Sequence, residues 1–400
     1  MPTTTPQERA DQHGCQAYGS DWQPTLLAQA PGRLELLGNH VDYNGGLVLA
    51  GAIDRIVAIV SADGDDSETI AMVAGDVSAE VASIPVEACR DWHATSTAIG
   101  PFDYARGVIA SLLARRQEIH GGRQLSIAGN VPLGFGMSSS AGLCVALVMT
   151  LASTELTTRD IVAIAREAEH RCGSPVGAMD QSASVAGGVI LFDGRDASYS
   201  VLEPELGDYV FAVADSRVTH ALGTSSYPVR VAESQEALDI IRSSKVPDLA
   251  SLGELGPDQW NTIRPDLADR LTDRLRQRVD HVVSEVARVR LGVEAVQAAD
   301  WDAFGRLMTE SGQSSNRNYE ISHPKVEELV DELNAIDGVA GARMMGGGEG
   351  GPALALIHHD ALPDIAATLE RGFFRRNPSH LQGDRLQVCS FGPGAKIVVL

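Results

Sequence analysis

Short apolar runs broken by glycine and proline dominate the first part of the chain. Residues 25–38 and 46–62 alternate such runs with turn residues, which predicts strands joined by tight turns. The spacing then becomes helical over residues 102–119. A predicted strand at 124–131 leads through a Gly/Ser loop into an apolar helical run at 140–153. This order of elements predicts a mixed α and β fold.

The residue composition and spacing change after the next predicted helix, at 160–172, and the predicted strand at 187–193. Residues 228–335 are rich in Arg, Glu, Ala and Leu at helical spacing. A chain of 400 residues also favours two domains over one. We therefore predict a flexible polar tail at 1–20, an N-terminal domain at 21–205, and a C-terminal domain at 206–400. The end of the chain, 385–400, is expected to form a closing strand pair and to pack back on the N-terminal domain.

Composition and charge narrow the class of protein. The chain is 44% hydrophobic and 21% charged, as in ordinary soluble globular proteins. Its net charge of -21 argues against nucleic acid or an anionic membrane as a partner, but not against a nucleotide held by local backbone groups. Five scattered cysteines without a C-x-x-C pair, and no signal peptide or membrane-spanning run, predict a cytoplasmic protein with reduced thiols.

The loop at residues 132–142, PLGFGMSSSAG, lies between a predicted strand and an apolar helix. Gly134 and Gly136 let the backbone approach an anion without a Cβ atom in the way. A helix beginning near Ser139 adds N–H groups and the positive end of its dipole, so the loop predicts phosphate binding. The alternative is a flexible turn in which a serine merely caps the helix.

A divalent cation is expected at the same loop. The motif is not a Walker A loop, since no lysine lies near it, and charge compensation must come from elsewhere. Among Ser138, Ser139 and Ser140, one hydroxyl is a candidate ligand for a Mg²⁺ ion that bridges the phosphates of ATP. Glu169, near the end of the following helix, is the candidate carboxylate.

Residues 30–46 place Arg33, His40, Asp42 and Tyr43 in a glycine-rich turn after a strand. An aspartate can accept hydrogen bonds from two neighbouring hydroxyls, and an arginine can stabilise charge that develops on oxygen. This set of side chains predicts a polyhydroxylated ligand. A surface turn with an Arg–Asp pair is the alternative.

Asp180 is expected in a loop at residues 177–181. Transfer of a phosphoryl group to an alcohol requires one positioned carboxylate that takes the proton of the hydroxyl. Arg33 nearby would keep that carboxylate ionised. The alternative is that Asp180 only caps a helix or supports a turn.

Taken together, seven segments in chain order resemble the galactokinases of the GHMP kinase superfamily, which also contains homoserine, mevalonate and phosphomevalonate kinases. The segments are APGRLELLGNHVDYNGG, FDYARGVI, NVPLGFGMSSSAG, VGAMDQ, THALGTSSYPVR, NYEISHP and ARMMGGGEGGPALALI. The resemblance spans residues 25–400. It implies a monomeric or homodimeric enzyme that uses ATP and Mg²⁺ to phosphorylate the anomeric hydroxyl of a galactose-like sugar.

The resemblance also implies an α+β fold, with an N-terminal domain like ribosomal protein S5 domain 2, a ferredoxin-like C-terminal domain, and the active site between them. Asp180 would be the catalytic base, with Arg33 as its electrostatic partner. Ser139 or Ser140 would hold Mg²⁺ together with Glu169. The residues that would contact the sugar are Glu35, Asn39, His40, Asp42, Gly177 and Tyr227. Those that would bind ATP are Pro132, Gly134, Gly136, Ser138, Ser139, Ser140, Ala141, Gly346, Gly347 and Gly348.

Two positions depart from the pattern of the family. Asn39 stands where galactokinases usually have a glutamate that meets the hexose near its C6 hydroxyl, and Glu35 stands where they usually have an asparagine. Loss of an acceptor charge at Asn39 leaves open a C6-altered substrate such as galacturonate or arabinose. If Asn39 is responsible, Asn39→Glu is expected to shift preference toward galactose. A non-catalytic sensor of sugar and ATP is the alternative from another class of protein, and a kinase for a non-sugar alcohol such as mevalonate is a third.

Overall fold

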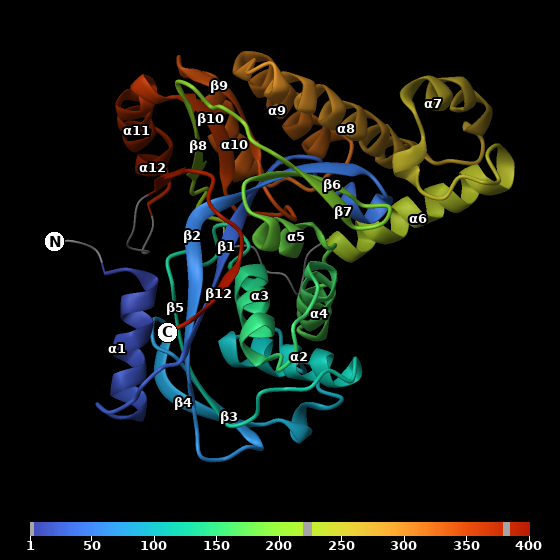
Figure 1. The fold of residues 1–400 in the computed structure, drawn as a ribbon. Helices are drawn as coiled ribbons and strands as arrows, with labels where there is room; N and C mark the ends of the chain where they lie inside the picture. Colours follow the sequence, from blue (N-terminus) through green and yellow to red (C-terminus); the bar gives the residue numbers. More distant parts are fainter. Residues whose placement is uncertain (1–3, 219–225, 379–384) are drawn as a thin grey trace.

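The computed structural model describes residues 4–218, 226–378 and 385–400. Residues 219–225, which begin the THALGTSSYPVR segment, lie outside the described residues, as do residues 1–3 of the predicted tail. Two sheets organise the chain, and Figure 1 shows most of the helices gathered around them in two groups.

The first sheet has eight strands, in the order β12-β1-β2-β5-β3-β4, with β6 beside β2 and β7 beside β6. Strands β3 and β5 pair in parallel, and the other described pairs are antiparallel. The strands are β1 (Leu26–Leu37), β2 (Leu47–Asp63), β3 (Thr69–Ala74), β4 (Ser78–Pro85), β5 (Arg123–Gly129), β6 (Val189–Asp193), β7 (Ser198–Leu202) and β12 (Lys396–Val399). Helices α2 (Pro101–Ala114), α3 (Ser139–Leu151), α4 (Thr158–Arg171) and α5 (Met179–Ala186) pack together beside it.

The second sheet is antiparallel, with the order β11-β8-β10-β9. Its strands are β8 (Tyr209–Ala214), β9 (Val339–Met344), β10 (Ala353–His358) and β11 (Leu386–Cys389). Sheet membership thus changes between Leu202 and Tyr209. The helices of this part are α6 (Tyr227–Ser244), α7 (Pro257–Ile263), α8 (Asp273–Gln297), α9 (Trp301–Arg317), α10 (Pro324–Asn334), α11 (Leu362–Arg371) and α12 (Phe373–Arg376). Among the described residues, none of the helices is long and apolar enough to cross a membrane.

The last two strands do not pair with each other, contrary to the sequence-based expectation. Strand β11 joins β8 in the second sheet, whereas β12 pairs with β1 at the edge of the first. Residues 390–395, SFGPGA, connect them, and their backbone bonds to residues of the first sheet, such as Asp54 N to Ser390 O at 2.9 Å. The end of the chain therefore ties the two sheets together.

The predicted flexible tail is wrong over residues 6–18, which form helix α1 (Pro6–Tyr18). Thr5 and Glu8 make a capping box at its start, and Pro6 occupies the first turn. The buried face of α1 carries small residues, among them Ala10 and Gly14, so it lacks the large apolar side chains that make a helix visible in a sequence. The capping box was the sequence feature that could have predicted the start of this helix.

Helix α1 packs against β2 and β5 of the first sheet. Ala10 is fully buried, in a small apolar cluster with Trp22. Arg9 donates to both carboxylate oxygens of Asp76, at 3.0 and 3.1 Å, and to the Gly129 carbonyl at 2.6 Å. The helix is therefore part of the folded domain.

We expect a charge at Ala10 to destabilise the protein. Ala10→Glu would bury a carboxylate in an apolar cluster, which lowers the free energy of unfolding by about 3 kcal/mol. Gln12→Glu is the matched control, because Gln12 is exposed on the same helix and a surface change costs within about 0.5 kcal/mol. Urea unfolding measures both. Equal, near-zero effects would contradict an ordered, packed α1.

Candidate active site

One cavity of about 760 Å³ lies where the two sheets meet. It is lined by the start of the loop after β1, the Gly/Ser loop before α3, the start of α5, and the glycine-rich turn between β9 and β10. All the predicted site residues line this cavity except Asn39, Tyr43 and Ala141. Ala141 is buried within α3, and only its backbone belongs to the first turn of that helix.

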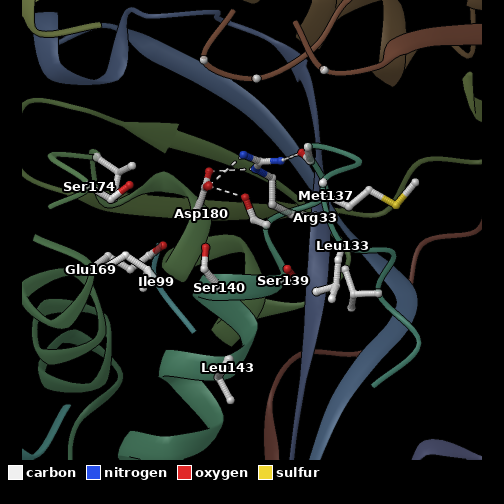
Figure 2. Close-up of a pocket in the computed structure, with 18 of the residues that line it drawn as sticks. Arg33, Ile99, Leu133, Met137, Ser139, Ser140, Leu143, Glu169, Ser174 and Asp180 are labelled. Carbon is white, nitrogen blue, oxygen red and sulfur yellow. Dashed lines mark hydrogen bonds and ion pairs between the residues drawn. The ribbon is translucent and has the colours of Figure 1, made fainter. Parts of the chain in front are cut away.

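Arg33 and Asp180 form the central ion pair of the cavity (Figure 2). Arg33 Nε and Nη2 each donate to one Asp180 carboxylate oxygen at 2.7 Å, and Nη1 donates to the Gly136 carbonyl at 2.6 Å. Burial works against the charged guanidinium, but Asp180, with Glu35 and Glu169, outweighs it and raises the pKa of Arg33. The ion pair, with the bond from Arg33 to Gly136, connects β1, the Gly/Ser loop and α5.

Asp180 is the second residue of helix α5, and not a loop residue as expected. An aspartate in the first turn is favoured by the helix dipole, and this explains why the helix begins before it. Its side chain keeps 19% of its surface exposed, which leaves the carboxylate accessible from the cavity.

The Gly/Ser loop has the backbone that phosphate binding requires. Gly134 and Gly136 have φ angles of 78° and 59°, and Ser138 adopts the left-handed region as well, at 52°. Ser138 does not cap helix α3 with its side chain, because its hydroxyl donates to Asp180 instead. The predicted alternative of a simple serine cap is therefore wrong. The first N–H groups of α3, which begins at Ser139, remain available for an anion.

Two side chains with the oxygen donors that Mg²⁺ prefers lie beside this helix end. Glu169, on α4, is 3% exposed and interacts with the Ser140 hydroxyl and with the Gln181 side-chain amide. Burial, with Asp180 adding to it, raises the pKa of Glu169 to about 7 against these two hydrogen bonds. In the described residues, no group of three His, Cys, Asp or Glu side chains is placed to hold a metal ion, so a Mg²⁺ ion here would complete its shell with water and phosphate oxygens. The hard oxygen donors fit that ion.

Asp42 and Gly177 meet closely at another part of the wall. A Cβ atom on Gly177 would lie 1.7 Å from Asp42 Oδ2, so position 177 requires glycine while the carboxylate stands there. Burial, with smaller contributions from Glu35 and Asp180, raises the pKa of Asp42 to about 7 although the backbone N–H of Tyr43 opposes it.

Aromatic rings surround His40 beside Asp42. His40 Nδ1 shares a hydrogen bond of 2.9 Å with the Tyr43 hydroxyl, and Nε2 lies 3.2 Å from the Gly347 carbonyl. The rings of His40 and Tyr227 are 4.9 Å apart. Tyr227 begins α6, so this wall of the cavity combines both parts of the chain.

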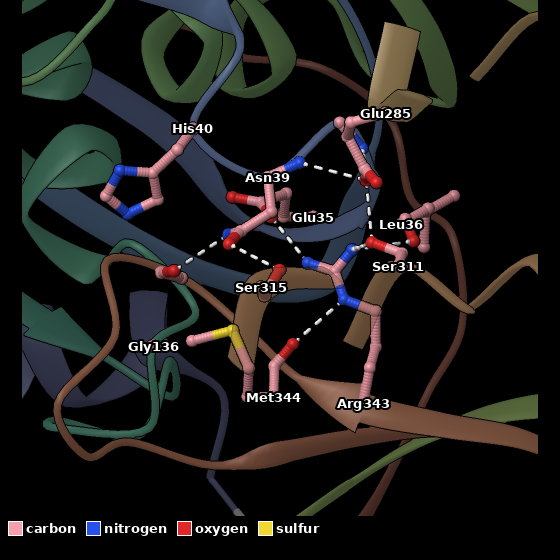
Figure 3. A network of polar contacts seen from close by, with 12 residues as sticks. Glu35, Leu36, Asn39, His40, Gly136, Glu285, Ser311, Ser315, Arg343 and Met344 are labelled. Carbon is pink, nitrogen blue, oxygen red and sulfur yellow. Dashed lines mark hydrogen bonds and ion pairs between the residues drawn. The ribbon is translucent and has the colours of Figure 1, made fainter. Parts of the chain in front are cut away.

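Asn39 is not among the residues that line the cavity, which contradicts its predicted contact with the sugar. Figure 3 shows it within a network of polar contacts with Glu35 and Ser315. It is fully buried, and its amide nitrogen donates to Glu35 Oε1 at 2.7 Å and to the Gly346 carbonyl at 2.9 Å. Its side-chain oxygen accepts from Ser315 at 3.2 Å. Glu35, in contrast, lines the cavity. The acid and the amide at these two positions touch each other, which the sequence did not reveal.

Sequence analysis missed an apolar part of the cavity and a buried arginine. The apolar lining includes Val57, Ile99, Val131, Leu133 and Leu143. These residues come from separate elements and follow the same periodicity as core residues, so no local pattern distinguishes them. Arg343, fully buried, bonds to Glu35 at 2.6 Å. The sequence feature that could have indicated its role is a single charged residue within the otherwise apolar strand β9.

Three family models match the chain. The galactokinase galactose-binding signature matches residues 15–62, the GHMP kinases N terminal domain residues 103–188, and the GHMP kinases C terminal domain residues 293–375. The matched ranges contain Arg33, Asp42, the Gly/Ser loop and Asp180, which the structure brings to one cavity.

Known proteins are similar over almost the whole length. A galactokinase of Chloroflexus aggregans is 34% identical over 385 residues, which covers 94% of both chains. A galactokinase of Thermotoga maritima is 32% identical over 358 residues, with 88% of this chain and 95% of that protein covered. The crystal structure of Lactococcus lactis galactokinase complexed with galactose matches with a TM-score of 0.86 and 26% identity, over 96% of this chain and 98% of that one.

A more distant structure shares the fold alone. Methanococcus jannaschii mevalonate kinase is 15% identical, with a TM-score of 0.60 over 92% of this chain and 98% of that one. The predicted two-domain α+β architecture, like ribosomal protein S5 domain 2 followed by a ferredoxin-like domain, is confirmed. With its three matched models and its relatives above 30% identity, the chain belongs to the galactokinases of the GHMP kinase family.

Proposed function

We propose that this protein transfers the γ-phosphoryl group of ATP to the anomeric hydroxyl of galactose. One observation carries the proposal: the Arg33–Asp180 pair lies in the same cavity as the uncapped N-terminus of α3 and the carboxylate of Asp42. The groups proposed to bind phosphate, to act as the base and to accept hydrogen bonds from the sugar thus line one cavity, which supports phosphoryl transfer to an alcohol.

In the proposed mechanism, Asp180 takes the proton of the anomeric hydroxyl as its oxygen bonds to the γ-phosphorus. The bond from that phosphorus to the β–γ bridging oxygen breaks, and ADP leaves with the electron pair. Arg33 orients the Asp180 carboxylate through two hydrogen bonds and stabilises charge that develops on the sugar oxygen. Ser138 fixes one carboxylate oxygen by donating to it, so that the base has a defined orientation.

The two ends of the cavity suit the two substrates. The backbone of residues 132–142 and of Gly346 to Gly348 would surround the phosphates, and the apolar part beside Tyr104 suits the adenine ring. Ser139 or Ser140, with Glu169, would hold Mg²⁺, which neutralises phosphate charge when bound. Asp42, His40, Gly177 and Tyr227 would contact the sugar. A cytoplasmic location is proposed as well, in keeping with five free cysteines.

Release of ADP in the presence of ATP and Mg²⁺ tests the proposed activity. The sugars to compare are galactose, galacturonate and arabinose, with mevalonate as a non-sugar alcohol. We expect kcat/KM to be highest for galactose. A tenfold preference for galacturonate or arabinose would contradict galactose as the substrate. Tight nucleotide binding without turnover of any of these compounds would indicate a sensor instead.

We expect the use of galactose to improve as pH rises through about 7. The pKa of Asp42 is raised to about 7, so this carboxyl is protonated below that pH and becomes the better hydrogen-bond acceptor above it. If the ionised form binds the sugar, kcat/KM for galactose increases about tenfold between pH 6 and pH 8. Asp42→Asn should lower kcat/KM and reduce this increase, and any increase that remains is assigned to Glu169, whose pKa is also raised to about 7. A value for the unaltered protein that does not change over this range would contradict the role of Asp42.

A further inference from the structure

Glu35 presents one satisfied and one available carboxylate oxygen at the cavity wall. Its Oε1 accepts from Arg343 Nη2 at 2.6 Å and from Asn39 Nδ2 at 2.7 Å. No residue in the described part of the chain donates to Oε2, and Glu35 lines the cavity. A carboxylate in this state can accept a hydrogen bond from a ligand without losing one from the protein.

The groups behind Glu35 fix its orientation (Figure 3). Arg343 is fully buried, and besides Glu35 it donates to the carbonyls of Met344 and Leu36, at 2.9 and 3.3 Å, and to the Ser311 hydroxyl at 3.3 Å. Both amide hydrogens of Asn39 are also used, on Glu35 and on the Gly346 carbonyl. These anchors come from β9, α9 and the glycine-rich turn, so the carboxylate is held from several sides.

The position of Glu35 along β1 suits a sugar ring. Glu35 follows Arg33 by two residues without a register shift between them, so both side chains lie on one face of the strand about 7 Å apart. That separation is comparable to the width of a pyranose with its hydroxyls. If the hydroxyl that reacts lies at Arg33 and Asp180, another hydroxyl of the same ring reaches Glu35.

We propose that Glu35 is the carboxylate that recognises a non-reacting hydroxyl of the sugar, and that Arg343 and Asn39 are its positioning residues. This inference rests on the proposed function. It names the substrate class as a neutral sugar, because a uronic acid would bring a further carboxylate into a cavity that the Glu35 and Asp42 carboxyl groups already line. Glu35 thus supplies the carboxylate that galactokinases usually carry at the position of Asn39. The argument for galacturonate, which rested on the loss of a negative charge at Asn39, no longer holds.

A panel of sugars tests the role of Glu35. Glu35→Gln should lower kcat/KM for galactose about 10- to 100-fold, the cost of losing a hydrogen bond to a charged acceptor. Galactoses that lack one hydroxyl at a time identify the partner. For the analogue that lacks the recognised hydroxyl, the variant and the unaltered protein should differ less than threefold. An equal loss for galactose and for every analogue would overturn the proposal.

Arg343 is tested by a double variant. Arg343→Gln should reproduce the same pattern of losses across the sugars, with the KM for ATP unchanged. Glu35→Gln combined with Arg343→Met removes both charges together and leaves neither as a buried unpaired charge, so it should fold even if Arg343→Gln does not. Its kcat/KM should equal that of Glu35→Gln alone. Losses that add up in the double variant would overturn the positioning role.

Glu233→Gln is the matched control. Glu233 binds the fully buried Arg278 at 2.6 Å and does not line the cavity. It should lower the melting temperature without any dependence on the sugar. A dependence like that of Glu35→Gln would contradict the assignment. The unaltered protein separates the two ideas: no turnover of galactose refutes the proposed function, whereas normal turnover with uniform losses in Glu35→Gln refutes only this inference.

Discussion

Asp180→Asn is expected to lower kcat about a thousandfold while ATP and galactose still bind. The amide cannot take the proton of the sugar hydroxyl, and a positioned base contributes roughly 10²- to 10⁴-fold to such a reaction. The change also leaves Arg33 without the charge to which it donates two hydrogen bonds. Initial rates of ADP release, with calorimetric binding of both substrates, separate the lost chemical step from lost binding.

Asp280→Asn is the matched control for this experiment. Asp280 also accepts from an arginine, Arg264, at 2.8 Å, and its side chain is 23% exposed against 19% for Asp180. It lies on α8 outside the cavity, so its replacement should leave kcat within about twofold. Activity of Asp180→Asn near that of the control would remove Asp180 from the role of base.

Asn39→Glu is expected to destabilise the protein and to lower its activity on galactose, the reverse of what the family pattern suggested. The new carboxylate would be buried where an amide now donates to Glu35 at 2.7 Å and to the Gly346 carbonyl at 2.9 Å. The new carboxylate would then face the Glu35 carboxylate and the Gly346 carbonyl, and none of these three acceptors could donate a hydrogen bond to another. A buried charge without a partner costs about 3–5 kcal/mol, which urea unfolding measures directly.

Exchange of the two residues is the control for this prediction. Glu35→Asn together with Asn39→Glu keeps one acid and one amide in contact, and so should recover most of the stability lost in Asn39→Glu. Asn39→Glu with full stability and higher kcat/KM for galactose would show that the side chain turns into the cavity, contrary to the structure.

The grouping of Arg33, Asp180 and the Gly/Ser loop could be predicted because each belongs to a local motif, and the structure brings all three to one cavity. Gly134 and Gly136 have the left-handed backbone that the prediction of a phosphate-binding loop requires. Arg33 and Asp180 were recognisable from the chemistry of the transfer and from the resemblance. The structure adds that Ser138 binds Asp180 and leaves the helix end open.

The contacts that orient Glu35 could not be predicted because they come from distant residues. Glu35 is oriented by Arg343, which lies 308 positions away in the sequence, and no spacing rule links them. Helix α1 was missed for another reason, since the residues it buries are as small as Ala10 and Gly14. A Cβ atom on Gly14 would lie 2.0 Å from the Trp22 ring. The close contact therefore requires glycine at a buried position where an apolar side chain would have indicated a helix.

The position of the phosphate on the product tests the central claim most directly. The protein is incubated with ATP, Mg²⁺ and ¹³C-labelled galactose, and coupling between ³¹P and ¹³C is measured by NMR. We predict a sugar phosphate whose phosphorus couples to the anomeric carbon. A phosphate on another carbon, or no sugar phosphate while the protein still binds ATP and galactose, would contradict the account.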